Sequence, residues 1–313
     1  MSWRRLANWL VMSIVLVFAV SALTFLLISL TPGDAARTVV GPEASAERYQ
    51  EVRAQLGLDL PVWQQYLNWL GGLLTGDPGR SLLSGVPIDQ VLQDRIEPTL
   101  ALMLCAFVCS TIVGITLGVV SASRGGALGR FVDMLSLGGI AVPTFWIGLV
   151  LVAVFSVGLG WLPTSGYRPI ADGVGEWLPR MILPIITLTL AGTALLARQT
   201  RDAVAEQLTM PYIVLLRAHG VSERSLVWRH ALRNAAVPII TILGMKLIGL
   251  TTGTVLVETV FSIPGLGSYA VQQTQAHDLP VVQIITLIFT IVVVVTNLLV
   301  ELGYGRLNVK ARA

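Results

Sequence analysis

The chain has 313 residues, of which 54% are hydrophobic and only 12% are charged. A soluble domain normally carries about a quarter of charged residues, so this composition leaves too little polar surface for a protein surrounded by water. The net charge of +3 and the pI of about 9.1 come without a basic, aromatic-rich soluble region, which excludes a nucleic-acid-binding domain. The composition therefore predicts a membrane protein.

Six apolar runs are each long enough to cross a bilayer, which takes roughly 18 or more residues in a helix. They cover residues 9–30, 99–121, 131–157, 181–198, 238–261 and 281–303. Because only helices and closed barrels satisfy backbone polar groups in lipid, we predict an all-α polytopic membrane protein with six transmembrane helices. The first run is longer than the apolar core of a signal peptide, and no small-x-small cleavage site follows it, so we interpret it as a retained span.

The distribution of arginine and lysine predicts the orientation of these spans, because cytoplasmic segments carry the excess of positive charge. If the N-terminus is cytoplasmic, most basic residues fall in short inner segments, namely Arg4, Arg5, Arg124, Arg130, Arg198, Arg201, Arg217, Arg224, Arg229, Arg233, Arg306, Lys310 and Arg312. The outer segments carry fewer, and most of these lie in one long loop, where charge has little influence. We therefore expect both termini to be cytoplasmic.

Residues 31–98 form the one sizeable region outside the predicted spans. Ser45 is positioned to cap a short helix in "ASAERYQEVRAQLGL", and Pro61 suits the first turn of a second helix in "DLPVWQQYLNWLGGLL". One face of the second helix is apolar and contains Val62, Tyr66, Trp69, Leu70 and Leu73. This face predicts either a helix at the membrane–water interface or a helix packed on its own protein, and both alternatives place an ordered cap outside.

The remaining spans carry few further signals. Pro143 is expected to kink the third span, and Pro184 lies near the outer end of the fourth. Cys105 and Cys109 are four residues apart in the second span, and we interpret them as packing residues rather than a thiol pair, since no other cysteine exists. No internal repeat or linker is evident, so residues 1–313 are predicted to form a single membrane domain.

The sequence lacks the motifs of common catalytic and metal sites. The only lysines are Lys246 and Lys310, and neither follows a glycine as the Walker A motif requires. His219 and His230 are eleven residues apart, which is about 16 Å along a helix and too far to share a metal, and His277 falls on the other side of the membrane. We therefore predict no catalytic residue, no metal site and no enzyme activity of this chain.

Lys246 is the one charged residue well inside a predicted span. Such a lysine faces a water-filled path, pairs with a carboxylate or extends towards the membrane surface, and these alternatives stay open. Glu258 follows twelve residues later, about 18 Å along the same helix, so it is not the partner. The acidic residues Asp133, Glu258 and Glu301 all fall near span ends, which disfavours a proton-coupled carrier.

The segment "RAHGVSERSLVWRHALRNAAVP", residues 217–238, is a basic, helix-like interruption between apolar runs. Gly220 predicts a break, Ser222 can cap the following helix, and Glu223 suits its positive N-terminus. The predicted apolar stripe of this helix contains Val221, Ser225, Trp228 and Leu232, with Arg224, Arg229 and Arg233 outside it. From the residues alone, an interfacial helix that binds anionic lipid is as good an interpretation as a protein-docking helix.

This segment resembles the cytoplasmic loop of ABC importer permeases that docks into an ATPase subunit, which reads like "RAKGLSER…RHALRNA…P" in the peptide-importer branch. The fragments "LTPGDAA", "GDPGRSL", "VPTFWIGL", "GWLPTSGY" and "VETVFSIPGLG" are similar to the B-type permease subunit of that branch, in the same order along the chain. There are departures, because the Glu-Ala-Ala signature of other importers would fall on Val214, Leu215 and Leu216, and Lys246 stands where an uncharged polar or acidic residue is more usual.

The resemblance implies a type I ABC importer permease fold in a prokaryotic inner membrane, with region 31–98 as an extracytoplasmic cap and region 203–236 as the cytoplasmic loop. It assigns ATPase coupling to Arg217, Ala218, His219, Gly220, Val221, Ser222, Glu223, Arg224, Trp228, Arg229 and Arg233. Candidates for the translocation path are Lys246, Thr193, Thr251 and Thr252. The lysine suggests altered path properties, whereas threonine hydroxyls can equally bond to their own helix.

The implied partners are a second, homologous permease subunit forming a heterodimer, two ATPase subunits, an extracytoplasmic substrate-binding protein and membrane lipid. This chain would need no cofactor, because ATP and Mg²⁺ would bind the ATPases. The implied substrates are dipeptides and oligopeptides, with nickel complexes, glutathione or opines as alternatives. A polytopic membrane enzyme or scaffold is the alternative of a different class.

Overall fold

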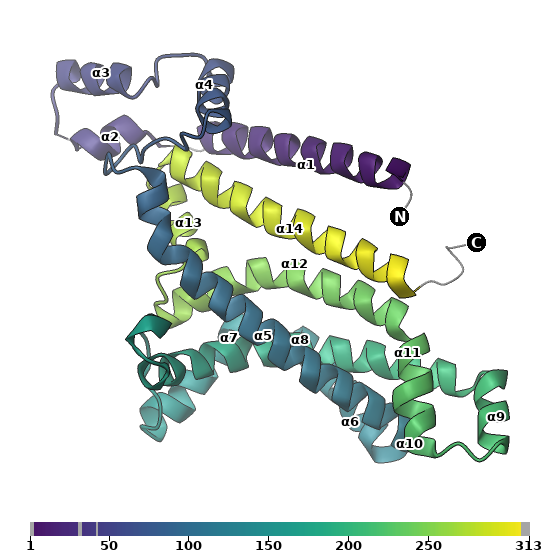
Figure 1. Ribbon diagram of the computed structural model, residues 1–313. Helices are drawn as coiled ribbons and strands as arrows, with labels where there is room; N and C mark the ends of the chain where they lie inside the picture. Colours follow the sequence, from purple (N-terminus) through teal and green to yellow (C-terminus); the bar gives the residue numbers. More distant parts are fainter. Residues whose placement is uncertain (1–2, 31–32, 42, 308–313) are drawn as a thin grey trace. The chain divides into compact units, whose positions relative to one another are not determined.

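The computed structural model describes residues 3–30, 33–41 and 43–307. In this part of the chain the regular structure is helical, apart from one isolated antiparallel bridge between Arg80 and Pro87. The chain forms two compact units, Met1–Thr99 with Pro264–Val294, and Leu100–Ile263 with Val295–Ala313. Helices α5 (Ile88–Arg124) and α14 (Leu279–Leu307) each contribute residues to both units (Figure 1).

The first unit contains the predicted cap region and begins with helix α1 (Trp3–Leu30), followed by α2 (Ala35–Val40), α3 (Ala46–Gln55) and α4 (Val62–Leu74). The expected cap of α3 is confirmed, because the Ser45 hydroxyl accepts a hydrogen bond of 3.3 Å from the Arg48 amide. Asp34 caps α2 in the same way, accepting a bond of 2.8 Å from the Ala36 amide. Pro61 stands one residue before α4, at its N-cap.

Helix α4 packs on its own protein along one side, which supports one of the two alternatives for its apolar face. The Tyr66 hydroxyl lies 2.7 Å from the Ser21 hydroxyl, and the Tyr66 ring meets Phe25 edge-on at 5.5 Å. Trp69 and Leu73 pack against a buried cluster, whose members are Ile88, Leu92, Leu266, Tyr269, Val281, Ile284 and Ile285. Another side of α4 exposes Trp63, Leu67 and Leu74, which is also compatible with contact to the membrane interface.

A buried carboxylate joins the segment before α5 to the turn before α14 within the first unit. The Ser81 hydroxyl donates to Asp278 at 2.5 Å, and the Leu82 amide donates to the same carboxylate at 3.1 Å. Asp278 is fully buried, so these bonds supply the partners that a buried charge requires. Helix α13 (Leu266–Gln275) is attached to α5 by a bond of 2.8 Å from the Leu266 amide to the Thr99 hydroxyl.

The second unit corrects the prediction of one kinked helix over residues 131–157. Helix α6 (Gly126–Ala141) ends before Pro143, α7 (Thr144–Leu151) begins after it, and a π-helical segment (Val152–Gly158) follows. Val142 is extended, at φ −93° and ψ 120°, because the proline ring disfavours helical geometry in the residue before it. Proline thus divides this apolar stretch instead of kinking it.

Five helices are long and apolar enough to cross a membrane in the described part of the chain, so the sixth predicted span stays a prediction. Apart from α1, α5 and α14, these are α8 (Val174–Leu208) and α12 (Ala236–Phe261). Helix α8 is much longer than the predicted 181–198 and contains both Pro179 and Pro184. Helices α5 and α8 approach closely, since a Cβ added at Gly118 would lie 2.5 Å from the Ala197 carbonyl oxygen.

Candidate functional site

The basic segment singled out in the sequence forms part of a helical hairpin at one end of the second unit (Figure 1). Its first arm is α9 (Pro211–Ala218), with proline at the first helical position, where its missing amide costs nothing. The second arm consists of α10 (Glu223–Ser225), a π-helical turn (Leu226–Ala231) and α11 (Leu232–Asn234), and it leads into α12. The two arms are in contact, and we call this element the 211–234 hairpin.

The turn between the arms is a Schellman motif. The Gly220 amide donates to the Arg217 carbonyl at 3.0 Å, and the Val221 amide donates to the Leu216 carbonyl at 3.1 Å. Gly220 has a φ of +78°, a left-handed conformation that glycine adopts without steric cost. The predicted break at Gly220 is therefore confirmed, and the backbone explains why the position requires glycine.

An ion pair closes the turn from the outside. The Arg217 guanidinium donates to both carboxylate oxygens of Glu223, at 2.5 and 3.1 Å. These bonds hold the pKa of the Glu223 carboxyl below its ordinary value. Ser222 occupies the predicted N-cap position, but its side chain makes no capping bond. The sequence reasoning found Glu223 through the helix terminus and missed its pairing with Arg217.

The inner side of the 211–234 hairpin rests on a buried apolar cluster within the second unit. Its members come from α5, α8, α9, the π-helical turn and α12, and they are Val119, Val204, Ile213, Leu226, Val227, Ala231, Ala235 and Ile239. The expected stripe is confirmed in part, because Val221 and Leu232 pack against this cluster. Trp228 does not belong to it, since the π-helical turn changes the register and buries Leu226, Val227 and Ala231. Trp228 is 42% exposed.

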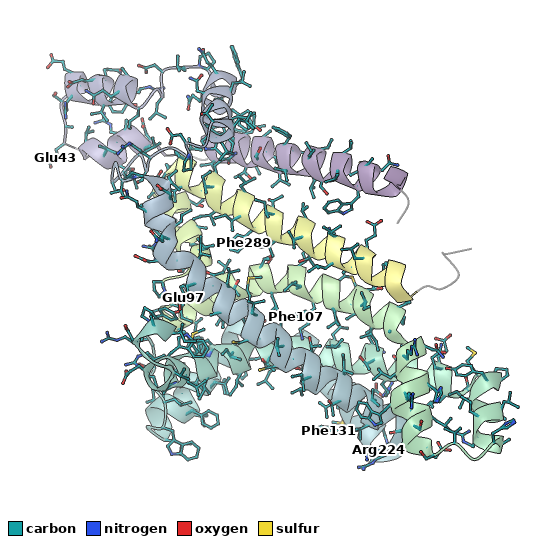
Figure 2. All side chains as sticks on the ribbon, viewed as in Figure 1. Glu43, Glu97, Phe107, Phe131, Arg224 and Phe289 are labelled. Carbon is teal, nitrogen blue, oxygen red and sulfur yellow. The ribbon has the colours of Figure 1, made fainter. Side chains whose placement is uncertain are left out.

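The outer side of the hairpin exposes both apolar and basic side chains. Val214, Leu215 and Trp228 are large exposed apolar residues. Ala218, His219, Gly220, Arg224, Arg229 and Arg233 are exposed as well, and Figure 2 shows Arg224 at the end of the hairpin. A rigid element that turns such a mixed surface outward is suited to contact with another molecule.

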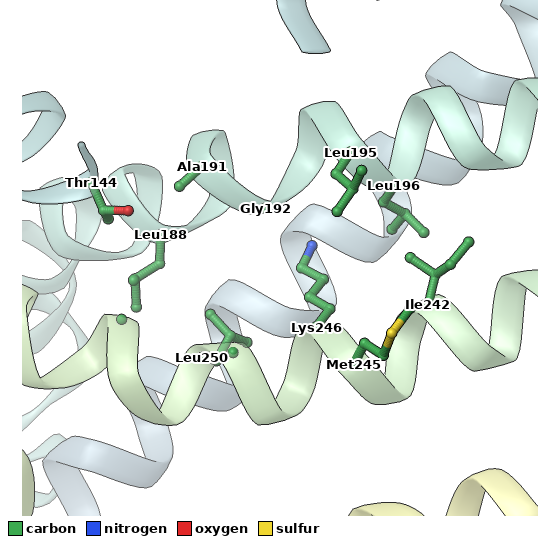
Figure 3. A pocket seen from close by; sticks show the side chains of 12 residues that line it. Thr144, Leu188, Ala191, Gly192, Leu195, Leu196, Ile242, Met245, Lys246 and Leu250 are labelled. Atoms are coloured by element: carbon green, nitrogen blue, oxygen red, sulfur yellow. The ribbon is translucent and has the colours of Figure 1, made fainter. Parts of the chain in front are cut away.

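Lys246 lines a cavity of about 320 Å³ between α7, α8 and α12 in the second unit. Its side chain extends from α12 towards Gly192 of α8 (Figure 3). The terminal nitrogen is buried, and no described residue offers it a hydrogen-bond partner. The structure therefore places this lysine at a cavity and gives it no carboxylate partner among the described residues, and sequence reasoning missed the glycine opposite.

The three threonine candidates do not gather around Lys246. Thr193 and Thr251 donate to carbonyl groups of their own helices, Thr189 and Ile248, both at 2.6 Å. Thr193 lines a different, apolar cavity of about 700 Å³ beside α5 and α6, and Thr252 is exposed. Thr251 and Thr252 line neither cavity. The polar group that Thr144 contributes to the Lys246 cavity was not predicted.

Comparison with known protein families decides the identity of the chain. Residues 114–313 match the family described as binding-protein-dependent transport system inner membrane component. Residues 3–102 match the N-terminal region described for the same transport-system membrane components. The chain belongs to this family. It is a permease, the membrane component of an ABC importer, and it is not catalytic itself because ATP hydrolysis lies in the partner ATPases.

Three relatives show how close the permease is to named proteins. It is 37% identical over 304 residues to a probable peptide ABC transporter permease of Sinorhizobium fredii, covering 97% of each chain. It is 42% identical over 286 residues to a protein named as a peptide transport system permease in Brucella abortus, covering 91% of each. It is 39% identical over 295 residues to the glutathione transport system permease GsiC of Escherichia coli, covering 93% of each.

A solved structure supports the fold of the permease. One chain of the methionine ABC transporter MetNI, crystallised in an inward-facing conformation, superposes with a TM-score of 0.53 at 18% identity. The match covers 68% of this chain and 96% of the other. The permease therefore has the type I ABC importer permease fold, which agrees with the prediction from the loop sequence.

Proposed function

We propose that this permease imports short peptides across the prokaryotic inner membrane, in a complex with a second, related permease subunit. Two ATPase subunits would drive transport, and an extracytoplasmic binding protein would deliver the substrate. The names of the relatives from Sinorhizobium fredii and Brucella abortus support a peptide substrate. The glutathione permease of Escherichia coli supports glutathione, itself a small peptide, as the alternative. Nickel complexes and opines stay as alternatives of the same architecture.

The 211–234 hairpin is the proposed surface for the ATPase. The observation that carries this is a turn fixed in three ways, by the Schellman bonds, by the Arg217–Glu223 pair and by the buried cluster beneath it. A segment held in this way moves as one body, so closure of an ATPase against its outer side would be transmitted into α8 and α12. An anchor for lipid has no need of such rigidity, which favours a protein partner.

The remaining parts of the complex follow from this assignment. The hairpin would face the cytoplasm, so both termini would be cytoplasmic and α2 to α4 would belong to an extracytoplasmic cap that receives the binding protein. ATP and Mg²⁺ would bind the ATPases, and this chain would carry no cofactor. Substrate identity would be set mainly by the binding protein, so identifying the ligand of that protein tests the substrate class directly.

The coupling role is tested with the complete complex in proteoliposomes. Gly220→Pro removes an amide donor and forbids the left-handed turn, and Glu223→Arg replaces an ion pair by repulsion with Arg217. We expect both variants to assemble in the membrane and to lose peptide-dependent coupling between ATP hydrolysis and uptake. Glu176→Arg is the control, since Glu176 is about as exposed as Glu223 and pairs with Arg180, far from the hairpin in sequence. Unchanged uptake and ATPase binding in both hairpin variants would contradict the role.

A further inference from the structure

The Lys246 cavity holds a positive charge that the described chain leaves without a partner. No carboxylate oxygen of a described residue lies within 4.0 Å of its nitrogen, since it takes part in no salt bridge, and no other acceptor bonds to it. Burying an ammonium group without a hydrogen-bond partner costs free energy. We therefore expect such a group either to have a function or to be paired by a molecule that binds there.

The cavity beside the lysine is large enough to hold a small ligand. The cavity of about 320 Å³ falls in the range of small-molecule sites. Its wall is made of small and apolar residues, with Gly192, Gly249 and Gly253 among them and Thr144 as the only other polar side chain. An apolar wall with one or two placed polar groups is the usual construction of a site that orients a ligand.

Gly192 allows the lysine to take this position. A Cβ added at Gly192 would lie 2.7 Å from the lysine Cε and 3.0 Å from its nitrogen, so any larger residue would push the ammonium group away. The lysine therefore extends from α12 towards α8, with the end of its aliphatic stem beside Gly192 and its charge at the cavity (Figure 3).

We propose that the Lys246 ammonium group binds a carboxylate of the substrate during its passage through the permease. This inference rests on the proposed import of peptides, whose shared anionic group is a carboxylate, at the C-terminus or on an acidic side chain. In a cavity of low polarity one ammonium group attracts one carboxylate strongly, and a single lysine with rotatable donors releases it more readily than a bidentate arginine. A substrate that passes through the permease has to be bound and then released, so transport requires both the attraction and the ready release.

Transport of matched peptides tests the inference in the complete complex with its binding protein. Three matched peptides are compared: the free acid, its C-terminal amide, and the same amide with one residue replaced by glutamate. The ratio of variant to wild-type uptake is taken for each peptide, so the preference of the binding protein cancels. In Lys246→Gln we expect uptake of a peptide recognised through its carboxylate to fall about tenfold, with the plain amide unchanged.

Two further variants, together with the three peptides, distinguish which carboxylate Lys246 binds. Lys246→Arg keeps the charge and should retain the preference for acids, whereas Gly192→Ala should weaken it by displacing the ammonium group. A fall for the free acid alone identifies the terminal carboxylate, and a fall for the glutamate peptide identifies the side chain. Equal ratios for all three peptides in Lys246→Gln overturn the inference. No uptake of any peptide by the wild type overturns the proposed function instead.

Chemical labelling gives a direct readout, because the chain has only two lysines, Lys246 and Lys310. A small amine-acylating reagent is applied to the assembled complex, and labelling of each lysine is measured by mass spectrometry. We expect the free-acid peptide with its binding protein and ATP to protect Lys246 several-fold, with Lys310 as the unprotected reference. Protection of Lys246 by the partner permease alone, without peptide, would show that a partner's acidic residue holds it and would overturn the inference.

Discussion

Gly220 offers the sharpest test of how the 211–234 hairpin is built. Its φ of +78° is the obstacle to a larger residue there, since a Cβ at this position would meet no atom of a described residue within 4 Å. Gly220→Ala therefore isolates the cost of the left-handed conformation, which is about 1–2 kcal/mol for a residue with a Cβ. That energy corresponds to a decrease of about 5- to 30-fold in the population of the closed turn relative to opened forms.

Hydrogen exchange measured by mass spectrometry on the assembled complex reports this population. The Val221 amide, which donates to Leu216, should lose protection by the same factor in Gly220→Ala. Gly220→Asn should lie closer to the wild type, because asparagine tolerates the left-handed region better than alanine. Gly220→Pro should lose at least as much protection as alanine, since it also removes the amide that donates to Arg217.

Two results would refute this reasoning. If Gly220→Ala and Gly220→Asn exchanged as slowly as the wild type, the turn would not depend on the left-handed residue. If Gly175→Ala, a control in α8 with ordinary φ and nothing within 4 Å of the added carbon, opened the hairpin equally, the effect would not be local.

Two further predictions concern other parts of the chain. Gly118→Ala should destabilise the permease by about 1–3 kcal/mol, because its Cβ would overlap backbone of α8, and a lower melting temperature of the purified complex than for Gly175→Ala checks this. At Asp34, burial raises the pKa of the carboxyl, but hydrogen bonds from Tyr49 and from the backbone of Ala36 and Arg37 outweigh it and leave the pKa below its ordinary value. The carboxylate thus stabilises the α2–α3 region above the unfolded pKa of about 3.9, and this stability is lost as the pH falls through the lower folded pKa. Peptic cleavage within residues 34–59 should accelerate on acidification below about pH 4 in the wild type and change less with pH in Asp34→Asn; equal pH dependence would contradict it.

The sequence predicted the helical class and most spans because apolar length is a property of the chain itself. The break at Gly220 and the cap at Ser45 were predictable for the same reason, since both depend on the local backbone. The division of the third apolar run was not, because Pro143 is compatible with a kink as well as with a stop, and hydropathy does not distinguish them.

Contacts between residues far apart in the chain could not be predicted from the sequence. Lys246 could be marked as unusual, yet the opposing Gly192 lies 54 residues earlier in the chain and has no signature of its own. Likewise, the stripe assigned to the 221–232 helix assumed 3.6 residues per turn, and the π-helical turn at Leu226–Ala231 breaks that assumption. The membrane side of each terminus and the contact residues of the ATPase stay predictions.

That π-helical turn sets the rotational phase between α12 and the residues before it. A π-helical turn contains one more residue than an α-helical turn would, and each residue of an α-helix corresponds to a rotation of about 100°. If the same residues Leu226–Ala231 were wound as an α-helix, α10 would be rotated by about that angle relative to α12. For the proposed coupling to the ATPase, the direction in which the hairpin moves matters as much as its rigidity, and the π-helical geometry of Leu226–Ala231 sets that direction.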